Sequence, residues 1–390
     1  MHTTRYLIVG GGLTADAACK GIREVDSDGG ITVVAEEAYP PYSRPPLSKA
    51  LWKGTEESSI WRATERLGVE LRLGRRIVAL DPTTHRATDE QGEVYAYERL
   101  LLATGGRPRR LPFAADEVIY YRTLDDYRRL RARVAAGARF VVIGGGFIGS
   151  EIAAALAMNG RPVTMVFPEP GIGARIFPSD LSAFVTDYYR ARGVKVLTGT
   201  SVSAIARVGD AVHVTTGDGR VLETDAVVAG LGLEPSIELA EAAGLHVANG
   251  IVVDDRGRVD GSDDVFAAGD VARFPVAALG GTVRVEHEDH AKSHGRRIGA
   301  NMAGADEPYD HLPFFYSDLF ELGYEAVGEL DTRRRTTADW TDVGGVGTVY
   351  YLDEEGRPRG VLLWNLFGRV DTARELIRAA KPIPTAELVR

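Results

Sequence analysis

The stretch Phe140–Glu151, FVVIGGGFIGSE, decides the fold of this chain. It opens with four apolar residues that favour β-structure, which predicts a buried parallel strand. Gly144, Gly146 and Gly149 then form the pattern G-x-G-x-x-G, and the apolar run to Met158 predicts a helix. This strand–turn–helix context is typical of a dinucleotide-binding unit. Glycines without side chains let a pyrophosphate approach the unpaired N–H groups and positive dipole end of the helix.

A second copy of the same pattern lies at the start of the chain. Residues 6–9 predict a strand, and the following Gly10–Ala15 fits G-x-G-x-x-A. A helix and another strand, residues 31–35, complete a βαβ unit, and Glu36 stands 26 residues after Gly10. An acid in this place binds a ribose hydroxyl in dinucleotide-binding folds. We therefore predict two nucleotide sites in one chain.

The composition is that of an ordinary globular protein with two or three domains. The 390 residues carry a formal net charge of -9, which argues against a nucleic-acid partner. Two basic clusters, Arg128–Arg133 and Arg333–Arg335, are interpreted as solvated faces. No apolar run reaches the roughly 18 residues needed to span a membrane, and we expect no signal peptide before the first strand. The expected location is the cytoplasm. Cys19 is the only cysteine, so we predict no disulfide within the chain.

Further segments place candidate residues at strand ends. Residues 40–49, PPYSRPPLSK, contain four prolines and predict a rigid, irregular loop that positions something. In VFAAGDV, a short strand closes on Asp270, an acid well placed to bond hydroxyl groups. The charged segment 116–136 predicts a helix, and alternating strands followed by a helix after residue 312 predict a separate α+β domain.

Taken together, these patterns resemble a known family. Two dinucleotide patterns, ATGGRPR between them and AAGD after them are similar to the two-dinucleotide flavoprotein reductases. The closer resemblance is to apoptosis-inducing factor and its bacterial relatives, a branch related to the ferredoxin reductases. It rests on RPPLSKALW, IGGGFIGSE, VFPEPG, GLGLEPS, RVEHEDHA, FYSDL, GYEAVG and LLWNLFGR, which cover nearly the whole chain.

The resemblance implies an α/β fold with two Rossmann-like domains, one for FAD and one for NAD, plus a C-terminal α+β domain. The expected ranges are 1–112 and 236–311 for the two parts of the FAD-binding domain, 113–235 for the NAD-binding domain and 312–390 for the C-terminal domain.

The resemblance also implies which residues contact the two cofactors, FAD and NADH. Those expected around FAD are Gly10, Gly12, Ala15, Glu36, Arg44, Lys49, Arg76, Ile77, Arg109, Asp270 and His287. Those expected around NADH are Gly146, Phe147, Ile148, Gly149, Glu151, Glu169 and Gly232, with Glu286 and Glu325 near the nicotinamide. An acid at position 169 repels a 2′-phosphate, so NADH is favoured over NADPH, although Arg175 lies nearby.

Four residues are the candidates for catalysis. The resemblance implies that Lys49 and Glu151 face each other beside the flavin, where hydride arrives, and that Phe147 and Tyr316 guide the nicotinamide. Tyr316 stands where the family often has Trp, so stacking is kept in a modified form. The alternative is an ordinary surface lysine and a glutamate in the first turn of a helix.

No metal site is expected. Three histidines, His287, His290 and His294, fall at roughly helical spacing, but no cysteine or catalytic acid pattern completes a ligand set.

The function predicted by the resemblance is an FAD-dependent oxidoreductase that takes hydride from NADH. Because the chain has no cysteine pair, the electron acceptor must be external: a ferredoxin-like protein, a quinone-like molecule or oxygen. The alternative is an NADH-sensing binding protein that forms a flavin–NAD charge-transfer complex and becomes a homodimer on reduction.

Overall fold

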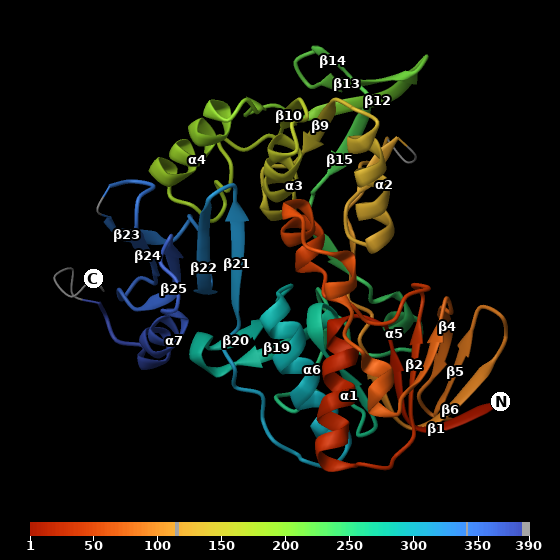
Figure 1. Ribbon diagram of the computed structural model, residues 1–390. Coiled ribbons are helices and arrows are strands. Elements are labelled where there is room, and N and C mark those ends of the chain that lie inside the picture. Colours follow the sequence, from red (N-terminus) through yellow and green to blue (C-terminus); the bar gives the residue numbers. More distant parts are fainter. Residues whose placement is uncertain (114–116, 341, 384–390) are drawn as a thin grey trace. The chain divides into compact units, whose positions relative to one another are not determined.

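The computed structural model describes residues 1–113, 117–340 and 342–383 (Figure 1). The chain forms two compact units. Unit 1 comprises Met1–Ser43, Glu57–Arg107 and Glu234–Pro313, and unit 2 comprises Arg44–Glu56, Pro108–Leu233 and the chain from Phe314 onward. The predicted range 1–112 therefore contributes residues 44–56 and 108–112 to unit 2. The division into four ranges by cofactor stays a prediction.

Unit 1 is built on a seven-stranded sheet. Its strands in spatial order are β3 (Glu70–Leu73), β2 (Ile31–Ala35), β1 (His2–Val9), β6 (Val94–Leu102), β5 (Arg86–Asp89) and β4 (Ile77–Asp81), and β18 (Val265–Ala267) also pairs with β6. The strands around β1 are parallel, and Tyr6 lies opposite Ile31. β2 is buried along its whole length, as expected of a parallel strand covered on both faces.

Two helices of unit 1, α1 (Leu13–Val25) and α6 (Glu288–Met302), lie side by side (Figure 1). Their close approach depends on glycine, because a Cβ atom at Gly299 would collide with the carbonyl oxygen of Ala18. The remaining elements of unit 1 are η3 (Glu57–Ile60), η4 (Thr64–Leu67), α5 (Glu238–Ala242), η5 (Gly269–Val271), η6 (Ala277–Leu279) and the small sheet of β17 (Ile251–Val252), β19 (Ala272–Val276) and β20 (Gly281–Val283).

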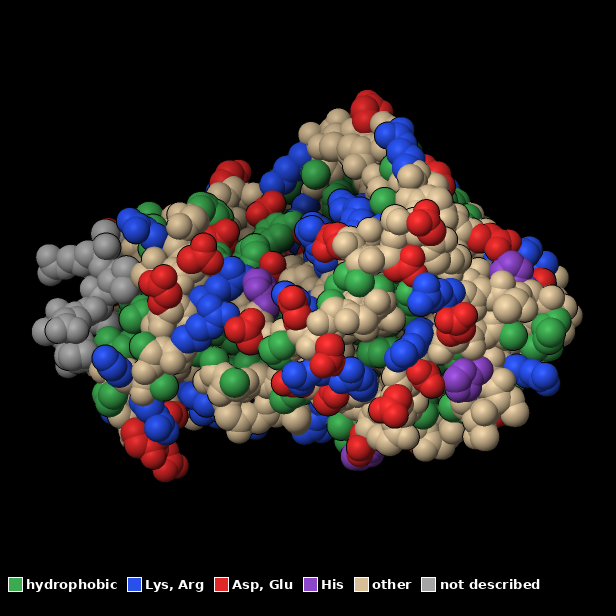
Figure 2. Space-filling view, turned by 90° about the horizontal axis from the view of Figure 1, so that it is seen from below, with side chains coloured by type: hydrophobic (Ala, Val, Ile, Leu, Met, Phe, Trp, Pro, Cys, Tyr) green, Lys and Arg blue, Asp and Glu red, His purple; other side chains and the backbone are tan. Residues whose placement is uncertain are grey.

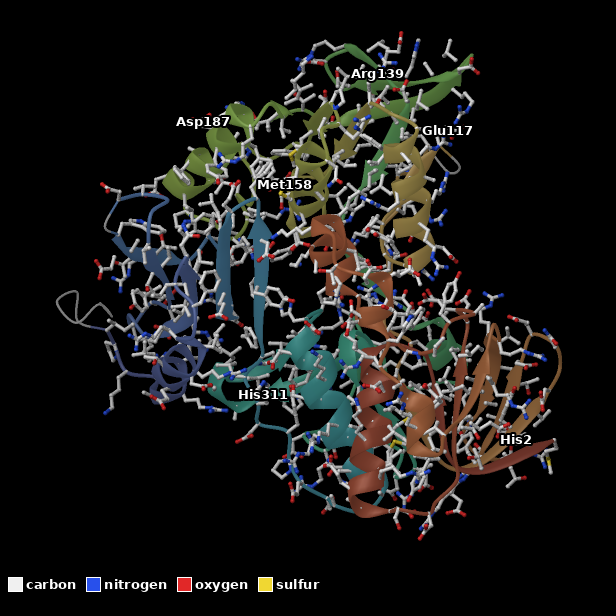
Figure 3. The ribbon with its side chains drawn as sticks, viewed as in Figure 1. His2, Glu117, Arg139, Met158, Asp187 and His311 are labelled. Carbon is white, nitrogen blue, oxygen red and sulfur yellow. The ribbon has the colours of Figure 1, made fainter. Side chains whose placement is uncertain are left out.

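Unit 2 contains a parallel sheet of five strands. Their order is β11 (Lys195–Leu197), β10 (Val163–Val166), β9 (Phe140–Ile143), β15 (Ala226–Ala229) and β8 (Val118–Tyr120), and the accompanying helices are α2 (Leu124–Ala135), α3 (Phe147–Met158) and α4 (Ser179–Ala191). Arg139, labelled in Figure 3, stands just before β9 and forms an ion pair with Asp225 just before β15. This contact joins the starts of two neighbouring strands.

The sequence pattern predicted a single helix over residues 116–136, and the structure contradicts this prediction. Within its described residues, β8 comes first and pairs in parallel with β15, and α2 begins only at Leu124. Asp116 lies outside the described residues. The helix start is set by a capping box, in which Thr123 and Asp126 bond each other's backbone N–H groups. The three-stranded sheet of β12 (Val202–Val208), β13 (Ala211–Thr216) and β14 (Val221–Thr224) was not predicted.

The C-terminal part of unit 2 is an antiparallel sheet with one helix, as predicted. The strand order is β21 (Phe314–Leu319), β22 (Leu322–Gly328), β25 (Pro358–Trp364), β24 (Gly347–Leu352) and β23 (Arg335–Trp340), and α7 (Val370–Ala379) packs on β22 and β25. Two short strands, β7 (Gly106–Pro108) and β16 (Leu233–Pro235), pair with each other where the chain passes between units.

The proline-rich segment is more regular than expected. It contains a short 3₁₀ helix, η1 (Pro45–Ser48), because prolines in the first positions of a helix lack only N–H groups that would have no partner there. A second 3₁₀ helix, η2 (Ala50–Lys53), follows Lys49. The carbonyl oxygen of Leu47 accepts hydrogen bonds from Trp52 Nε1, at 2.6 Å, and from the hydroxyl of Tyr121. The bond from Tyr121 attaches this segment to another part of unit 2.

The charged side chains on the surface and the hydropathy of the helices bear on the predictions made from composition. On the face drawn in Figure 2, Lys and Arg side chains are interspersed with Asp and Glu side chains. Among the described residues, no helix has both the length and the apolar character needed to cross a membrane.

Candidate functional site

The glycine turn of unit 2 has the form needed for a pyrophosphate. At Gly144, φ is +112° and a Cβ atom would collide with the carbonyl oxygen of Gly230. A Cβ atom at Gly149 would collide with the carbonyl oxygen of Gly144, so these glycines are needed for close packing. Gly146, which caps α3, differs because a Cβ atom there would meet nothing within 4 Å. The open side of the turn is therefore where a pyrophosphate fits, at the N-terminus of α3.

The turn of unit 1 repeats this arrangement. Gly10 has φ of +120°, and a Cβ atom there would strike the carbonyl oxygen of Ala103. Gly12 caps α1 and has open space where its Cβ atom would be. Ala15 takes the place of the third glycine and is fully buried in the core of unit 1. Both turns therefore fit a dinucleotide, and both were predictable from the sequence.

Around the first turn, the predicted FAD residues of unit 1 occupy strand ends. Glu36 is exposed and directly follows β2. Asp270 is the second residue of η5, which follows β18 after Ala268. Arg76 is exposed and lies 3.6 Å from Glu90, while Ile77 is the buried first residue of β4. Their roles toward the cofactor stay predictions.

The predicted flavin-side segment of unit 1 is organised by a residue that the sequence reasoning missed. Arg284 donates to Glu286 Oε1 at 2.7 Å and to the carbonyl oxygen of Asp270 at 3.1 Å. The Arg284 side chain is only 10% exposed, so it joins two predicted cofactor residues from inside the protein. His287 caps α6, and burial lowers its pKa to about 4, although Asp270 raises it. His287 is thus neutral near pH 7, and the helix N-terminus supplies positive potential there.

In unit 2, the predicted pair Lys49 and Glu151 is present. Lys49 Nζ lies 2.7 Å from Glu151 Oε1, and the two side chains are 12% and 3% exposed. Glu151 also accepts hydrogen bonds from Ser48 Oγ, at 2.5 Å to Oε2, and from Ser317 Oγ, at 2.6 Å to Oε1. Neither serine was singled out from the sequence. The structure differs from the alternative of an ordinary surface lysine, because the Glu151 carboxylate is buried and bonded by three side chains from two other segments of unit 2.

Tyr316 lies beside this pair, and Phe147 begins the helix that carries Glu151. The ammonium of Lys49 lies 5.2 Å from the centroid of the Tyr316 ring, and Tyr316 is 36% exposed. The Phe147 ring meets Phe315 edge-on at 5.3 Å and is 37% exposed. Tyr316 lies directly opposite Glu325 in the pairing of β21 with β22. Exposed aromatic faces beside a buried ion pair are suited to stacking against a flat ring.

The remaining predicted residues of unit 2 lie at strand and helix ends. Glu169 follows β10, and its Oε1 atom forms an ion pair with Arg175 Nη2 at 2.6 Å. Arg109 is exposed, and its backbone N–H donates to the carbonyl oxygen of Gly232. Two other candidates are Arg44, which donates to the carbonyl oxygen of Arg122, and Ile148, which is half-buried in the first turn of α3.

Three further side chains considered in the sequence analysis, Cys19, His290 and His294, are buried. Burial raises the pKa of the Cys19 thiol to about 12, with a smaller contribution from Asp16, so the thiol is not a nucleophile near pH 7. His290 and His294 are buried, with ring centroids 4.7 Å apart, and His290 stacks on Phe274. Within the described ranges, no group of three or more His, Cys, Asp and Glu residues could hold a metal ion.

Comparison with known proteins agrees with this arrangement. Residues 4–295 match the model of the pyridine nucleotide-disulphide oxidoreductases, and residues 298–344 match the C-terminal model of apoptosis-inducing factor. The chain belongs to the pyridine nucleotide-disulphide oxidoreductase family. The predicted relationship to apoptosis-inducing factor and the ferredoxin reductases is thereby confirmed.

Among its relatives are two curated proteins that align with nearly the whole chain. The ferredoxin–NAD(+) reductase component of an anthranilate 1,2-dioxygenase system from Burkholderia cepacia is 35% identical, over 98% of this chain and 97% of that protein. Apoptosis-inducing factor 1 from Dictyostelium discoideum is 32% identical, over 97% of this chain and 79% of that protein.

Solved structures of the family share the fold. The putidaredoxin reductase of a covalent complex with putidaredoxin has a TM-score of 0.92 at 32% identity, covering 99% of this chain and 95% of that one. A ferredoxin reductase from Rhodopseudomonas palustris has a TM-score of 0.91 at 30% identity, covering 100% and 98%. The predicted fold class is confirmed: two Rossmann-like domains and a C-terminal α+β domain. This family member is an oxidoreductase that uses FAD and NAD(H) and is related to the ferredoxin reductases.

Proposed function

We propose that the chain oxidises NADH and passes the electrons to a small external iron–sulfur protein of the ferredoxin type. The observation that carries this proposal is the alignment of 98% of this chain with 97% of a ferredoxin–NAD(+) reductase component. The likeness to putidaredoxin reductase, bound in its solved complex to putidaredoxin, supports it.

The chemistry of the only cysteine requires the acceptor to be external. The family is named for enzymes that act on disulphides, and an internal dithiol needs two cysteines. This chain has Cys19 alone, buried in α1 with a raised pKa. The electrons therefore pass to an acceptor outside this chain. NADH gives up two electrons and one proton, and each of two iron–sulfur acceptors takes one electron.

The residues of the chain bind and orient the reactants. When bound, FAD supplies the chemistry that accepts a hydride and releases single electrons. The turns at Gly12 and Gly146 receive the two pyrophosphates, and Glu169 binds the adenosine ribose of NADH. Lys49 and Glu151 would hold a fixed pair of charges beside the nicotinamide, and Phe147 and Tyr316 would orient its ring. The N-terminus of α6 would supply positive potential to bound FAD.

An anaerobic experiment tests the proposal. The purified holoprotein is titrated with NADH and followed by its flavin absorbance, and the reduced protein is then mixed with a ferredoxin, a quinone or oxygen. We expect bleaching by NADH and fastest reoxidation by the ferredoxin. A protein without flavin, or one that NADH does not bleach, would overturn the reductase assignment. Faster reoxidation by another acceptor would overturn the proposed partner. Cys19→Ala serves as the control and is expected to transfer electrons at the wild-type rate.

The alternative, an NADH sensor that dimerises on reduction, finds no support in the comparisons or in the described structure. We therefore do not propose it.

A further inference from the structure

The carboxylate of Glu151 is bonded from three directions within unit 2. Glu151 lies on α3, Lys49 follows η1, Ser48 ends η1, and Ser317 lies on β21. Ser48, Glu151 and Ser317 are 7%, 4% and 1% exposed. Ser317 is separated from Glu151 by 166 positions and Ser48 by 103, so the arrangement depends on the folded unit.

The two serine hydroxyls offset part of the desolvation cost of the buried Lys49–Glu151 pair. Removing two charges from water costs more than their attraction returns unless the remaining lone pairs are also bonded. Lys49 and Ser317 donate to one carboxylate oxygen, and Ser48 donates to the other. Bonds to both oxygens fix the plane of the carboxylate and hence the direction from which it holds the ammonium.

We infer that Ser48 and Ser317 are positioning residues for hydride transfer, which act by fixing Glu151 and, through it, Lys49. Ser317 has a second connection, because its neighbour Tyr316 places its ring 5.2 Å from Lys49 Nζ. One short part of β21 thus sets both the carboxylate that holds the lysine and the aromatic ring beside it. This inference rests on the proposed function, since it assigns residues that support the same site.

A double-mutant cycle tests whether Ser317 acts through Glu151. Flavin reduction by NADH is measured in a stopped-flow instrument for the wild type, Ser317→Ala, Glu151→Gln and the double variant, together with FAD content, Tm and the dissociation constant for NAD⁺. We expect Ser317→Ala to slow reduction roughly tenfold while FAD content and NAD⁺ affinity stay close to wild type. In the Glu151→Gln background, the same change should alter the rate by less than about twofold. Ser48→Ala should behave in the same way.

Ser182→Ala is the matched control. Ser182 is 3% exposed in unit 2, and its hydroxyl donates to a backbone carbonyl, that of Ile172, at 2.8 Å. Its removal should lower Tm as much as Ser317→Ala does and leave the reduction rate unchanged.

The outcomes separate the inference from the proposed function. If Ser317→Ala slows reduction equally in both backgrounds, or if Ser182→Ala slows it as much, the positioning role is refuted while the reductase assignment stands. If NADH does not bleach the wild-type flavin, the proposed function itself fails. Should Glu151→Gln not retain FAD, Lys49→Gln replaces it in the cycle with the same expected loss of the Ser317 effect.

Discussion

Lys49 Nζ and Glu151 Oε1 lie 2.7 Å apart within one compact unit, although 102 positions separate the two residues. The sequence resemblance implied this pair, but with Lys49 on the FAD-binding domain. In the structure, residues 44–56 belong to unit 2, and the carbonyl oxygens of Leu47 and Trp52 accept hydrogen bonds from Tyr121 and Asn159. The geometry of this pair is therefore set by the folding of unit 2.

Removing the Glu151 carboxylate should slow flavin reduction by NADH without releasing FAD. In Glu151→Ala, Lys49 loses its partner in a mostly buried place, so we expect flavin reduction by NADH to slow by at least roughly tenfold. FAD should stay bound, because Glu151 does not belong to the glycine turn of unit 1. Stopped-flow absorbance with a parallel assay of released flavin checks both points. Wild-type reduction kinetics would refute a role for Glu151.

Glu169 and Arg175 should together determine the choice between NADH and NADPH. Their ion pair of 2.6 Å joins an acid that repels a 2′-phosphate to a cation that would attract one. We expect Glu169→Ala to raise the ratio of kcat/KM for NADPH to that for NADH by roughly tenfold, because repulsion is lost and Arg175 is released from its partner.

The double variant decides the part played by Arg175. Glu169→Ala with Arg175→Ala should lose most of the gain toward NADPH. Asp187→Ala, which removes another exposed acid of unit 2 (Figure 3), is the control and should leave the ratio unchanged. A ratio that does not move in Glu169→Ala would mean that Glu169 is not the ribose acid.

The parts of the site that were predictable are those that depend on local sequence. The strands before Gly10 and Gly144, the turns and the following helices are contiguous, and glycine is required there by the backbone itself. Arg284, Ser48 and Ser317 could not be found in this way, because a serine or arginine acquires its role from a partner distant in the sequence. For the same reason, the membership of residues 44–56 in unit 2 became visible only in the folded chain.

Local patterns also failed where tertiary pairing overrode them. Val118–Tyr120 reads as part of a charged helical segment, yet these residues are buried and extend the parallel sheet beside β15. A sheet edge with an available partner can take up residues that local propensity assigns to a helix.

The buried histidines should make the protein sensitive to acid. Burial lowers the pKa of His290 to about 3, with Asp270 opposing the shift, and also lowers the pKa of His294. The folded state therefore keeps both rings neutral, while the unfolded chain takes up a proton below about pH 6.5. The unfolding free energy should fall as pH drops from 6.5 toward 3, by up to about 1.4 kcal/mol per pH unit for each histidine.

Urea denaturation of the holoprotein at pH 7, 6 and 5 measures this slope. His290→Gln should have a shallower dependence than the wild type, because one group no longer takes up a proton on unfolding. His246→Gln is the control, since His246 is 55% exposed and pairs with Asp260 at the surface. An unaltered slope in His290→Gln would contradict the assignment.

Two glycines of the same turn should respond oppositely to alanine. Gly146→Ala adds a methyl group where nothing lies within 4 Å and where φ of -87° suits alanine, so the fold and Tm should stay close to wild type. The methyl group occupies the space of the pyrophosphate, however, and should weaken NADH binding by roughly tenfold or more. Gly144→Ala places a methyl group against the carbonyl oxygen of Gly230 at φ of +112°, so it should lower Tm or prevent folding. Thermal denaturation and NADH titration of both variants make the comparison. If Gly146→Ala binds NADH as the wild type does, the open side of this turn is not where the pyrophosphate lies.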